Sequence, residues 1–196
     1  RRLEELFLGA VQALVQALVV KDQYTRGHSI RVSQYSSLLA REIGLSESMI
    51  RQIELGGQVH DIGKIGVREA VLNKEGPLTD EEYQHIMTHP MLGWQILSPL
   101  LGEEPVALSI VRSHHERFDG RGIPDKLAGM DIPMEARIAG IADAFDAMTS
   151  GRAYRRGRYM SAEDAIADIT RCSGTQFDPE LAPAFINVIR REKLAS

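Results

Sequence analysis

The sequence predicts an all-α fold, a helical bundle of roughly eight or nine helices with an extended N-terminal helix. Helix-start signals recur along the chain, whereas no stretch alternates apolar and polar residues over the useful length of a strand. No internal repeat or low-complexity tract divides the chain. With 196 residues and 43% hydrophobic content, the chain is expected to form one domain with an extension and to bury its own core.

The first predicted element is a long apolar helix. The run "LFLGAVQALVQALVV" at residues 6–20 is interrupted by Gln12 and Gln16, and it is shorter than the roughly 20 residues that a bilayer span needs. We interpret residues 1–20 as a linker or dimerisation helix, with packing onto its own domain as an equal alternative. The dimer seam would consist of apolar residues spaced three and four apart: Leu3, Leu6, Ala10, Ala13, Ala17 and Val20.

Two histidines are predicted to face inward from the helices that follow. His28 is in register with one apolar row, and His60 continues another. Taken alone, an inward histidine such as His28 is more often a satisfied core residue than a ligand. The rows are Val32, Tyr35 and Leu39 for His28, and Met49, Ile53 and Gly56 for His60.

Later helices are predicted from their caps. Thr79 and Glu82 form a capping-box pattern, and Pro90 occupies the position of a first helical residue, which leaves His89 at or near the cap. The last two helices are expected to begin after Ser161 and after the pair Asp178 and Pro179.

The segment 116–133 is predicted to be a functional loop. It carries three glycines and two prolines without periodicity, and it is longer than the usual loop of about 4 to 6 residues.

Composition excludes several classes of partner. A net charge of −4 and a pI near 5.9 leave no basic surface for long nucleic acids, so any phosphate site must be local. The single cysteine, Cys172, excludes an internal disulfide framework and a cysteine-rich zinc site. The sequence also lacks the cleavage site of a signal peptide. We therefore expect a cytoplasmic domain without membrane contact.

The stretch "GGQVHDIGKIGV" places an imidazole, a carboxylate and an ammonium close together. If His60, Asp61 and Lys64 converge on the interior, they require mutual pairing or a cation. A second carboxylate, Asp143, lies on a helix that is apolar or small on both faces and is therefore expected to be buried. From periodicity alone, a solvated Asp143 on an alanine-rich outer face is an equal alternative.

Five imidazoles and two carboxylates exceed what one four-coordinate zinc ion takes. Two ions bridged by one carboxylate would use them all, and Asp61 is the natural bridge because its two oxygens can reach ions about 3.5 to 4 Å apart. The neighbouring histidines 114 and 115 would then serve neighbouring ions. The candidate ligands are His28, His60, Asp61, His89, His114, His115 and Asp143.

Six separated motifs together resemble the bacterial HD-GYP domain, a branch of the HD phosphohydrolases. They are "KDQYTRGHS", "HDIGKIG", "LNKEGPLTDEE", "THP", "HHERFDGRGIP" and "ADAFDAMTSGRAYR", and the likeness extends from about residue 14 to residue 182. The resemblance implies that residues 21–196 form an all-helical, metal-dependent phosphohydrolase domain. It further implies an enzyme of second-messenger signalling that hydrolyses cyclic di-GMP to pGpG and GMP.

The resemblance also implies the roles of individual residues. The family uses two or three metal ions, and the same seven ligands are expected to hold two divalent ions here, with iron or manganese expected and zinc, nickel or magnesium as alternatives. A hydroxide bridging the ions would attack phosphorus, and Lys64 would hold a substrate phosphate or the attacking water. Arg152 and Arg155 would clamp phosphate oxygens. Further substrate contacts are assigned to the loop residues Asp119, Gly122 and Ile123.

The sequence departs from the family pattern at two positions. Ile123 replaces the tyrosine of the family motif, which bears on substrate contact and on docking of a GGDEF-type or other signalling partner through residues 116–133. Tyr24 stands four residues before His28, where members with three metals carry a glutamate, and this favours two metals. Two alternatives remain open: a phosphodiesterase for another cyclic dinucleotide or a nucleotide monoester, and a catalytically weak sensor or interaction module.

Overall fold

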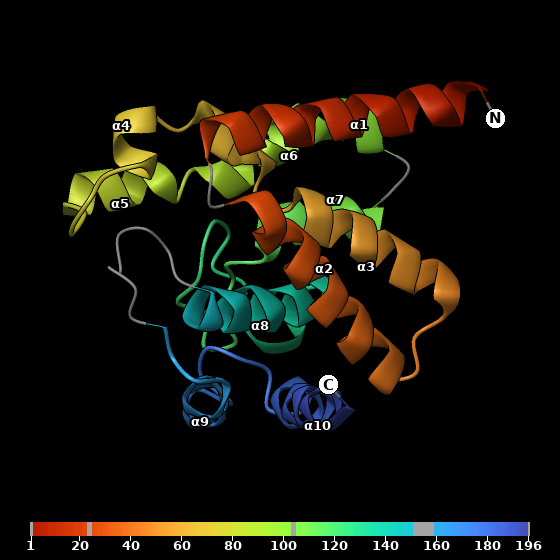
Figure 1. Cartoon of the computed structure of the whole chain (residues 1–196), viewed down its shortest axis with the longest axis vertical. Coiled ribbons are helices and arrows are strands. Elements are labelled where there is room, and N and C mark those ends of the chain that lie inside the picture. The colour runs from red at the N-terminus through yellow and green to blue at the C-terminus, as the bar shows by residue number, and fades with distance from the viewer. Residues whose placement is uncertain (1, 23–24, 103–104, 151–158, 196) are drawn as a thin grey trace.

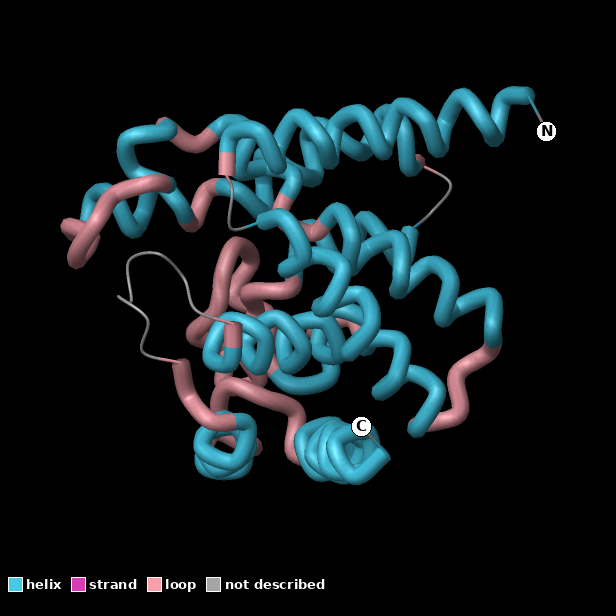
Figure 2. The backbone as a smooth tube through the Cα atoms, in the orientation of Figure 1, coloured by secondary structure: helices cyan, strands magenta, loops and turns pink. Residues whose placement is uncertain are grey.

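A computed structural model describes residues 2–22, 25–102, 105–150 and 159–195 of the chain (Figure 1). The described residues form ten α-helices and two short 3-10 helices, and the tube of Figure 2 shows helix and loop but no strand among them. The predicted all-α class is therefore confirmed. One of these helices, α4, spans only four residues, so the expected count of helices was close.

The described helices are numbered in chain order. The α-helices are α1 (Arg2–Lys21), α2 (Thr25–Glu42), α3 (Glu47–Val59), α4 (Glu69–Leu72), α5 (Asp80–Ile86), α6 (His89–Leu101), α7 (Pro105–Ser113), α8 (Met134–Thr149), α9 (Ala162–Arg171) and α10 (Leu181–Ala195). The 3-10 helices are η1 (Ile62–Gly66) and η2 (Gly129–Asp131). Among the described helices, none combines the length and the apolar character needed to cross a membrane.

The predicted caps agree with the structure except at one helix. Thr79 and Glu82 form a reciprocal capping box, and the Ser161 side chain accepts a hydrogen bond from the backbone N–H of Asp164. Helix α6 begins one residue earlier than expected, at His89, so Pro90 is its second residue. Proline is tolerated at either place because the first N–H groups of a helix have no intrahelical partner.

Two hydrophobic clusters hold the bundle together. The larger one joins α2, α3, α7, α8, α9 and α10, and it includes the fully buried Leu39, Ile53, Ile138, Ile141 and Phe185. The smaller one joins α1, α3, η1, α6 and α7. In Figure 1, α1 lies along one side of the molecule, α9 and α10 lie on the opposite side, and α2, α3, α7 and α8 lie between them.

Helix α1 packs onto its own domain through one face and leaves the other exposed. Val11 and Leu18 are buried in the smaller cluster, beside Val59 and Ile62. The predicted dimer seam is the opposite face, where Ala10, Ala13, Ala17 and Val20 are exposed. Packing on the domain and exposure of the seam thus coexist, and the dimer remains a prediction. The side chains of the two other seam residues, Leu3 and Leu6, lie outside the described part.

We expect Leu18→Ala to destabilise the domain by about 2 to 5 kcal/mol, because a buried leucine is replaced by a cavity that the surroundings fill only in part. Leu18 is 2% exposed in the cluster that α1 shares with α3, α6 and η1. Chemical denaturation measures the change in the free energy of unfolding. Val20→Ala is the matched control, since Val20 is 85% exposed and should change stability by less than about 0.5 kcal/mol. Equal effects of the two variants would contradict the packing of α1.

Candidate metal centre

Six of the seven candidate ligands lie at or next to helix ends, and Asp143 lies inside a helix. His60 follows the last residue of α3 and is followed by Asp61, at the start of η1. His89 begins α6, and the pair His114 and His115 follows α7. His28 comes from the first turn of α2 and Asp143 from α8. The seven predicted ligands therefore come together in space although they are distributed over more than a hundred residues of sequence.

Most of these side chains are buried. The exposed fraction is 0% for His28 and 6% for Asp143. The solvated alternative for Asp143 is therefore wrong: α8 packs on several sides, and Asp143 points into the centre. Donor atoms of three subsets lie within 4.8 Å of one another, namely His28, His60 and Asp143; His60, Asp61 and His114; and His89, His114 and His115.

Three histidines are held in one tautomer by main-chain carbonyls at the ends of the preceding helices. A carbonyl oxygen only accepts hydrogen bonds, so each Nδ1 must carry the hydrogen, and each neutral imidazole presents a lone pair at Nε2. The Nδ1-to-oxygen distances are 2.8 Å from His60 to Gly57, 2.8 Å from His89 to Ile86 and 2.9 Å from His114 to Ile110.

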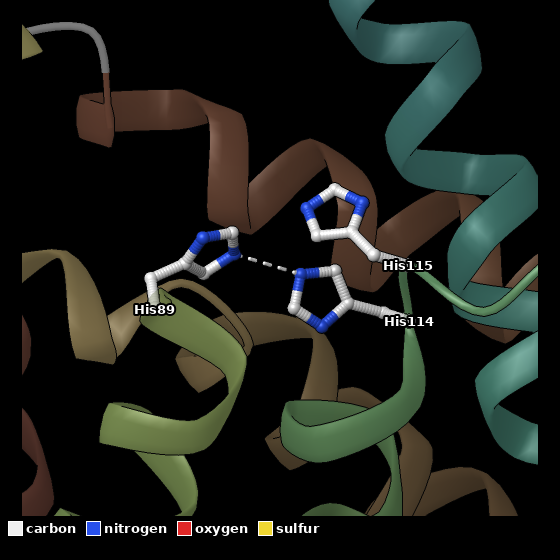
Figure 3. A group of neighbouring side chains, drawn as sticks. All are labelled: His89, His114 and His115. Carbon is white, nitrogen blue, oxygen red and sulfur yellow. Dashed lines mark hydrogen bonds between the residues drawn. The ribbon is translucent and has the colours of Figure 1, made fainter. Parts of the chain in front are cut away.

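The Nε2 lone pairs converge on the same buried space. The Nε2 atoms of His89 and His114 face each other at 3.2 Å, with His115 beside them (Figure 3). The Nε2 atom of His60 has no hydrogen-bond partner in the described part of the protein, and it lies 3.5 Å from a carboxylate oxygen of Asp61. Lone pairs that face one another, or face a carboxylate, repel unless a cation lies between them. The donor set therefore fits divalent metal ions that accept nitrogen and oxygen ligands.

The two oxygens of Asp61 face different histidines. Its Oδ1 lies 3.3 Å from Nε2 of His89, whereas its Oδ2 lies 3.5 Å from Nε2 of both His28 and His60. The ammonium of Lys64 is 2.6 Å from Oδ2, and Lys64 is 6% exposed. Asp61 thus stands between two groups of nitrogen donors, as a carboxylate that bridges two ions would.

The protonation states suit metal binding. Burial lowers the pKa values of His89, His114 and His115 to about 3, so these imidazoles are neutral near pH 7. Burial alone would raise the pKa of Asp61, but the adjacent Lys64 ammonium and the surrounding histidines hold it well below its usual range. The centre therefore combines neutral nitrogen donors with an ionised carboxylate.

His28 differs from the other ligands in its electrostatics. Burial by itself lowers the pKa of His28, but hydrogen bonds and charge from Asp143 and Asp146 outweigh burial and raise this pKa to about 9. Binding of a metal ion at Nε2 would therefore displace a proton. Asp146 was not identified from the sequence, although its spacing of three residues from Asp143 places both on one side of α8.

A pocket of about 360 Å³ opens beside His114 and His115. Its walls include Tyr83 from α5, Ile123 from the 116–133 loop, Arg137 from α8 and Gln176. The volume lies within the range of small-molecule sites. The long loop predicted to be functional therefore forms one wall of a pocket that adjoins the candidate ligands.

Glu116 shapes this loop and was also missed, although it directly follows His115 in the sequence. Its carboxylate accepts hydrogen bonds from the backbone N–H groups of Asp125 at 2.6 Å and Leu127 at 3.1 Å. Gly122 lines the pocket, and a Cβ there would lie 2.3 Å from the backbone nitrogen of Arg117, so only glycine fits.

The remaining predicted substrate residues do not all line the pocket. Ile123 lines the pocket. Asp119 is not among the residues lining it; its carboxylate binds the Arg117 guanidinium and the backbone N–H of Arg121. Arg152 and Arg155, like Tyr24, lie outside the described residues.

We expect the metal-free protein to lose stability as the pH falls from 7 to 5. Burial lowers the pKa of His60 as well, and His89, His114 and His115 have pKa values of about 3 in the folded state and about 6.5 when unfolded. The unfolded state therefore binds more protons in this window. Denaturation of chelator-treated protein at several pH values measures the slope. His115→Gln removes one histidine with a lowered pKa and should make the fall in stability with pH less steep. Identical slopes for the variant and the native protein would contradict the lowered pKa of His115.

Comparison with known proteins places these features in a family. A family model described as "HD domain" matches residues 12–181. The cyclic di-GMP phosphodiesterase response regulator RpfG of Xanthomonas campestris is 38% identical over 93% of this chain and 48% of its own length. A cyclic di-GMP phosphodiesterase of Thermotoga maritima is 35% identical over 97% of this chain and 53% of its own length. The chain thus spans about half the length of these curated relatives.

The fold also matches a solved structure. A cyclic GMP-AMP-specific phosphodiesterase of Vibrio cholerae superposes with a TM-score of 0.69 at 21% identity, covering 99% of this chain and 50% of that protein. At this identity the likeness concerns the fold alone. The sequence matches, in contrast, confirm the resemblance inferred from the six motifs. This chain belongs to the HD-domain family, together with relatives named cyclic di-GMP phosphodiesterases.

Proposed function

We propose that this chain is a metal-dependent phosphodiesterase domain that hydrolyses cyclic di-GMP to pGpG and then to GMP. The observation that carries the proposal is the convergence of imidazole lone pairs and two carboxylates on one buried space that adjoins a pocket. The names of the relatives from Xanthomonas campestris and Thermotoga maritima support the choice of substrate.

Two ions would be held by two overlapping ligand sets that share the carboxylate of Asp61. One set would consist of His28, His60, Asp61 and Asp143, and the other of Asp61, His89, His114 and His115. Iron or manganese is proposed, because imidazole and carboxylate donors suit both, and zinc, nickel or magnesium are the alternatives.

The ions would supply positive charge to polarise the phosphate and a water acidic enough to attack phosphorus near neutral pH. Lys64 would hold either that water or a phosphate oxygen, and the 2.6 Å distance between its ammonium and the carboxylate of Asp61 supports this role. The added water breaks one phosphodiester bond and opens the ring to pGpG, and a second hydrolysis gives two molecules of GMP. Arg152 and Arg155 are proposed to bind phosphate oxygens away from the ions.

The pocket would take the part of the substrate that lies beyond the scissile phosphate. Ile123 provides an apolar contact there, and Tyr83, which also lines the pocket, offers a half-exposed ring. Gly122 is required for the shape of the loop, and Asp119 would act on substrate through that loop.

Two further associations remain proposals. A GGDEF-type or other signalling partner would dock through residues 116–133, and a second copy of the chain would pair along the exposed seam of α1. The seam residues Ala10, Ala13, Ala17 and Val20 are exposed in the single chain, which is compatible with such a pairing.

The experiment that tests the function begins with metal analysis of protein purified without chelators. The protein is then loaded with manganese or, anaerobically, with ferrous iron and incubated separately with cyclic di-GMP and with 3'3'-cGAMP. Chromatography should show pGpG or GMP with the higher kcat/KM for cyclic di-GMP. A higher value for 3'3'-cGAMP would instead assign another cyclic dinucleotide as the substrate, which is the alternative that the sequence left open. Tight binding of cyclic di-GMP without turnover would instead identify a sensor.

We expect Asp61→Ala to abolish hydrolysis and to reduce the bound metal, because it removes the only carboxylate that faces both ligand sets in the described structure. Activity and metal content are measured on the same preparation. Asp168→Ala is the control: this residue pairs with Arg171 on the exposed side of α9, and its loss should leave both quantities unchanged. Retention of two ions by Asp61→Ala would show that Asp61 is not a bridge.

We expect Ile123→Tyr to lower KM for cyclic di-GMP and to leave kcat within about threefold. An aromatic ring on the pocket wall can stack on a base, which contributes roughly 1 to 3 kcal/mol, or about one to two powers of ten in affinity. Ile123 contributes to the pocket but is not one of the candidate metal ligands. Steady-state kinetics of the variant and the native protein give both parameters. If the substitution creates hydrolysis where the native chain has none, the native chain is a sensor.

A further inference from the structure

We propose that Asp146 is a positioning residue that makes the metal site of His28 the tighter of the two sites. The inference rests on the metal centre of the proposed function and goes beyond it, since Asp146 is not one of the ligands. It predicts that the two ions bind with unequal affinity because Asp146, which is not a ligand, acts on His28.

Asp146 is fully buried at 0% exposure, on α8 and one turn beyond Asp143. Its Oδ2 accepts a hydrogen bond from Nδ1 of His28 at 2.7 Å. With the hydrogen at Nδ1, the Nε2 atom of His28 faces the carboxylate oxygens of Asp143 at 3.2 Å and Asp61 at 3.5 Å. Asp146 therefore sets both the tautomer and the direction of the His28 ring.

The anchor of His28 differs in charge from those of the other histidines. His60, His89 and His114 donate from Nδ1 to neutral main-chain carbonyls, whereas His28 donates to an ionised carboxylate. A carboxylate partner raises the basicity of an imidazole ligand more than a neutral carbonyl does. His28 is thus the strongest nitrogen donor among these four, and it belongs to the site that also contains Asp143.

Asp146 is itself held rigidly, which is what a positioning residue requires. The Arg31 guanidinium donates to its Oδ1 at 2.6 Å and to its Oδ2 at 3.1 Å. The Ser150 hydroxyl donates to Oδ1 at 3.0 Å. These donors offset the cost of burying the carboxylate and leave it directed at His28 rather than at the ions.

A purely structural role is the competing explanation, because the Arg31–Asp146 pair also ties α2 to α8. The two explanations differ in how the binding of the two ions responds. A structural role would weaken both sites together through the fold, whereas a positioning role acts through His28 and weakens only the site that contains it.

The test is a titration of chelator-treated protein with Mn²⁺, followed by calorimetry and requiring no substrate. Asp146→Asn keeps an oxygen that can accept from Nδ1 but removes the charge. It should weaken one of the two binding steps by about 10- to 100-fold and leave the other within about threefold. His28→Gln should abolish the same step and so assign it.

Glu54→Gln serves as the matched control. Like Asp146, Glu54 accepts hydrogen bonds from a serine and an arginine, Ser37 at 3.0 Å and Arg41 at 3.3 Å, both on α2. In the described structure no recorded hydrogen bond or ion pair joins it to a histidine. Its loss should leave both binding steps unchanged.

Ser150→Ala is the second variant, for use if Asp146→Asn does not fold by circular dichroism. It removes one donor to Asp146 without touching a ligand and should weaken the same step by a few-fold. Native-like binding of both ions by Asp146→Asn, or equal weakening of both steps in either variant, overturns the proposal alone. If Asp146→Asn does not fold, unchanged binding of both ions by Ser150→Ala overturns the proposal alone. Absence of metal binding by the native chain overturns the metal centre and this proposal with it.

Discussion

The fixing of imidazole rings by hydrogen bonds at Nδ1 is the interaction on which the rest of the site depends. In three cases the acceptor is a carbonyl close to the end of a helix, three or four residues before the histidine that it holds. The terminal carbonyls of a helix have no intrahelical partner, so His60 and His89 satisfy them while turning Nε2 toward the centre. One bond thus serves helix termination and ligand orientation together.

This local arrangement requires that several helix ends meet, and the two hydrophobic clusters bring them together. The larger cluster positions α2, α7 and α8, and the smaller one positions η1 and α6. The helix α3 and the helix α7 contribute to both clusters, so the segments that carry His60 and His114 are fixed from two sides. The helices of both clusters carry the ligands of the centre, and the pocket is lined by His114, His115 and residues of the loop that follows them.

Much of this organisation could be predicted from the sequence, because periodicity reports which side of a helix is buried. The apolar row of His28 indicated an inward side chain, and His28 is buried. The small residues around Asp143 left a buried and a solvated position equally open, and the structure shows that Asp143 is buried. Periodicity does not reveal hydrogen-bond partners, so the carbonyl anchors and the contact between His28 and Asp146, 118 residues apart, were not predicted. The pocket wall contributed by Tyr83 and Gln176 also depends on tertiary packing. Spacing along α1 predicted a dimer seam, which stays a prediction, and did not reveal the buried face of Val11 and Leu18.

The carbonyl anchors have a consequence for the inheritance of the site. A main-chain oxygen is present whatever side chain its residue carries, so no amino-acid replacement at Gly57, Ile86 or Ile110 deletes the acceptor itself. Genetic change can therefore remove these three supports only by displacing the helices. The support of His28 is encoded in a single aspartate codon, which one nucleotide change can convert to asparagine. Among the four histidines His28, His60, His89 and His114, drift in the chemistry of this centre would thus begin at His28, whose Nδ1 support is a side chain.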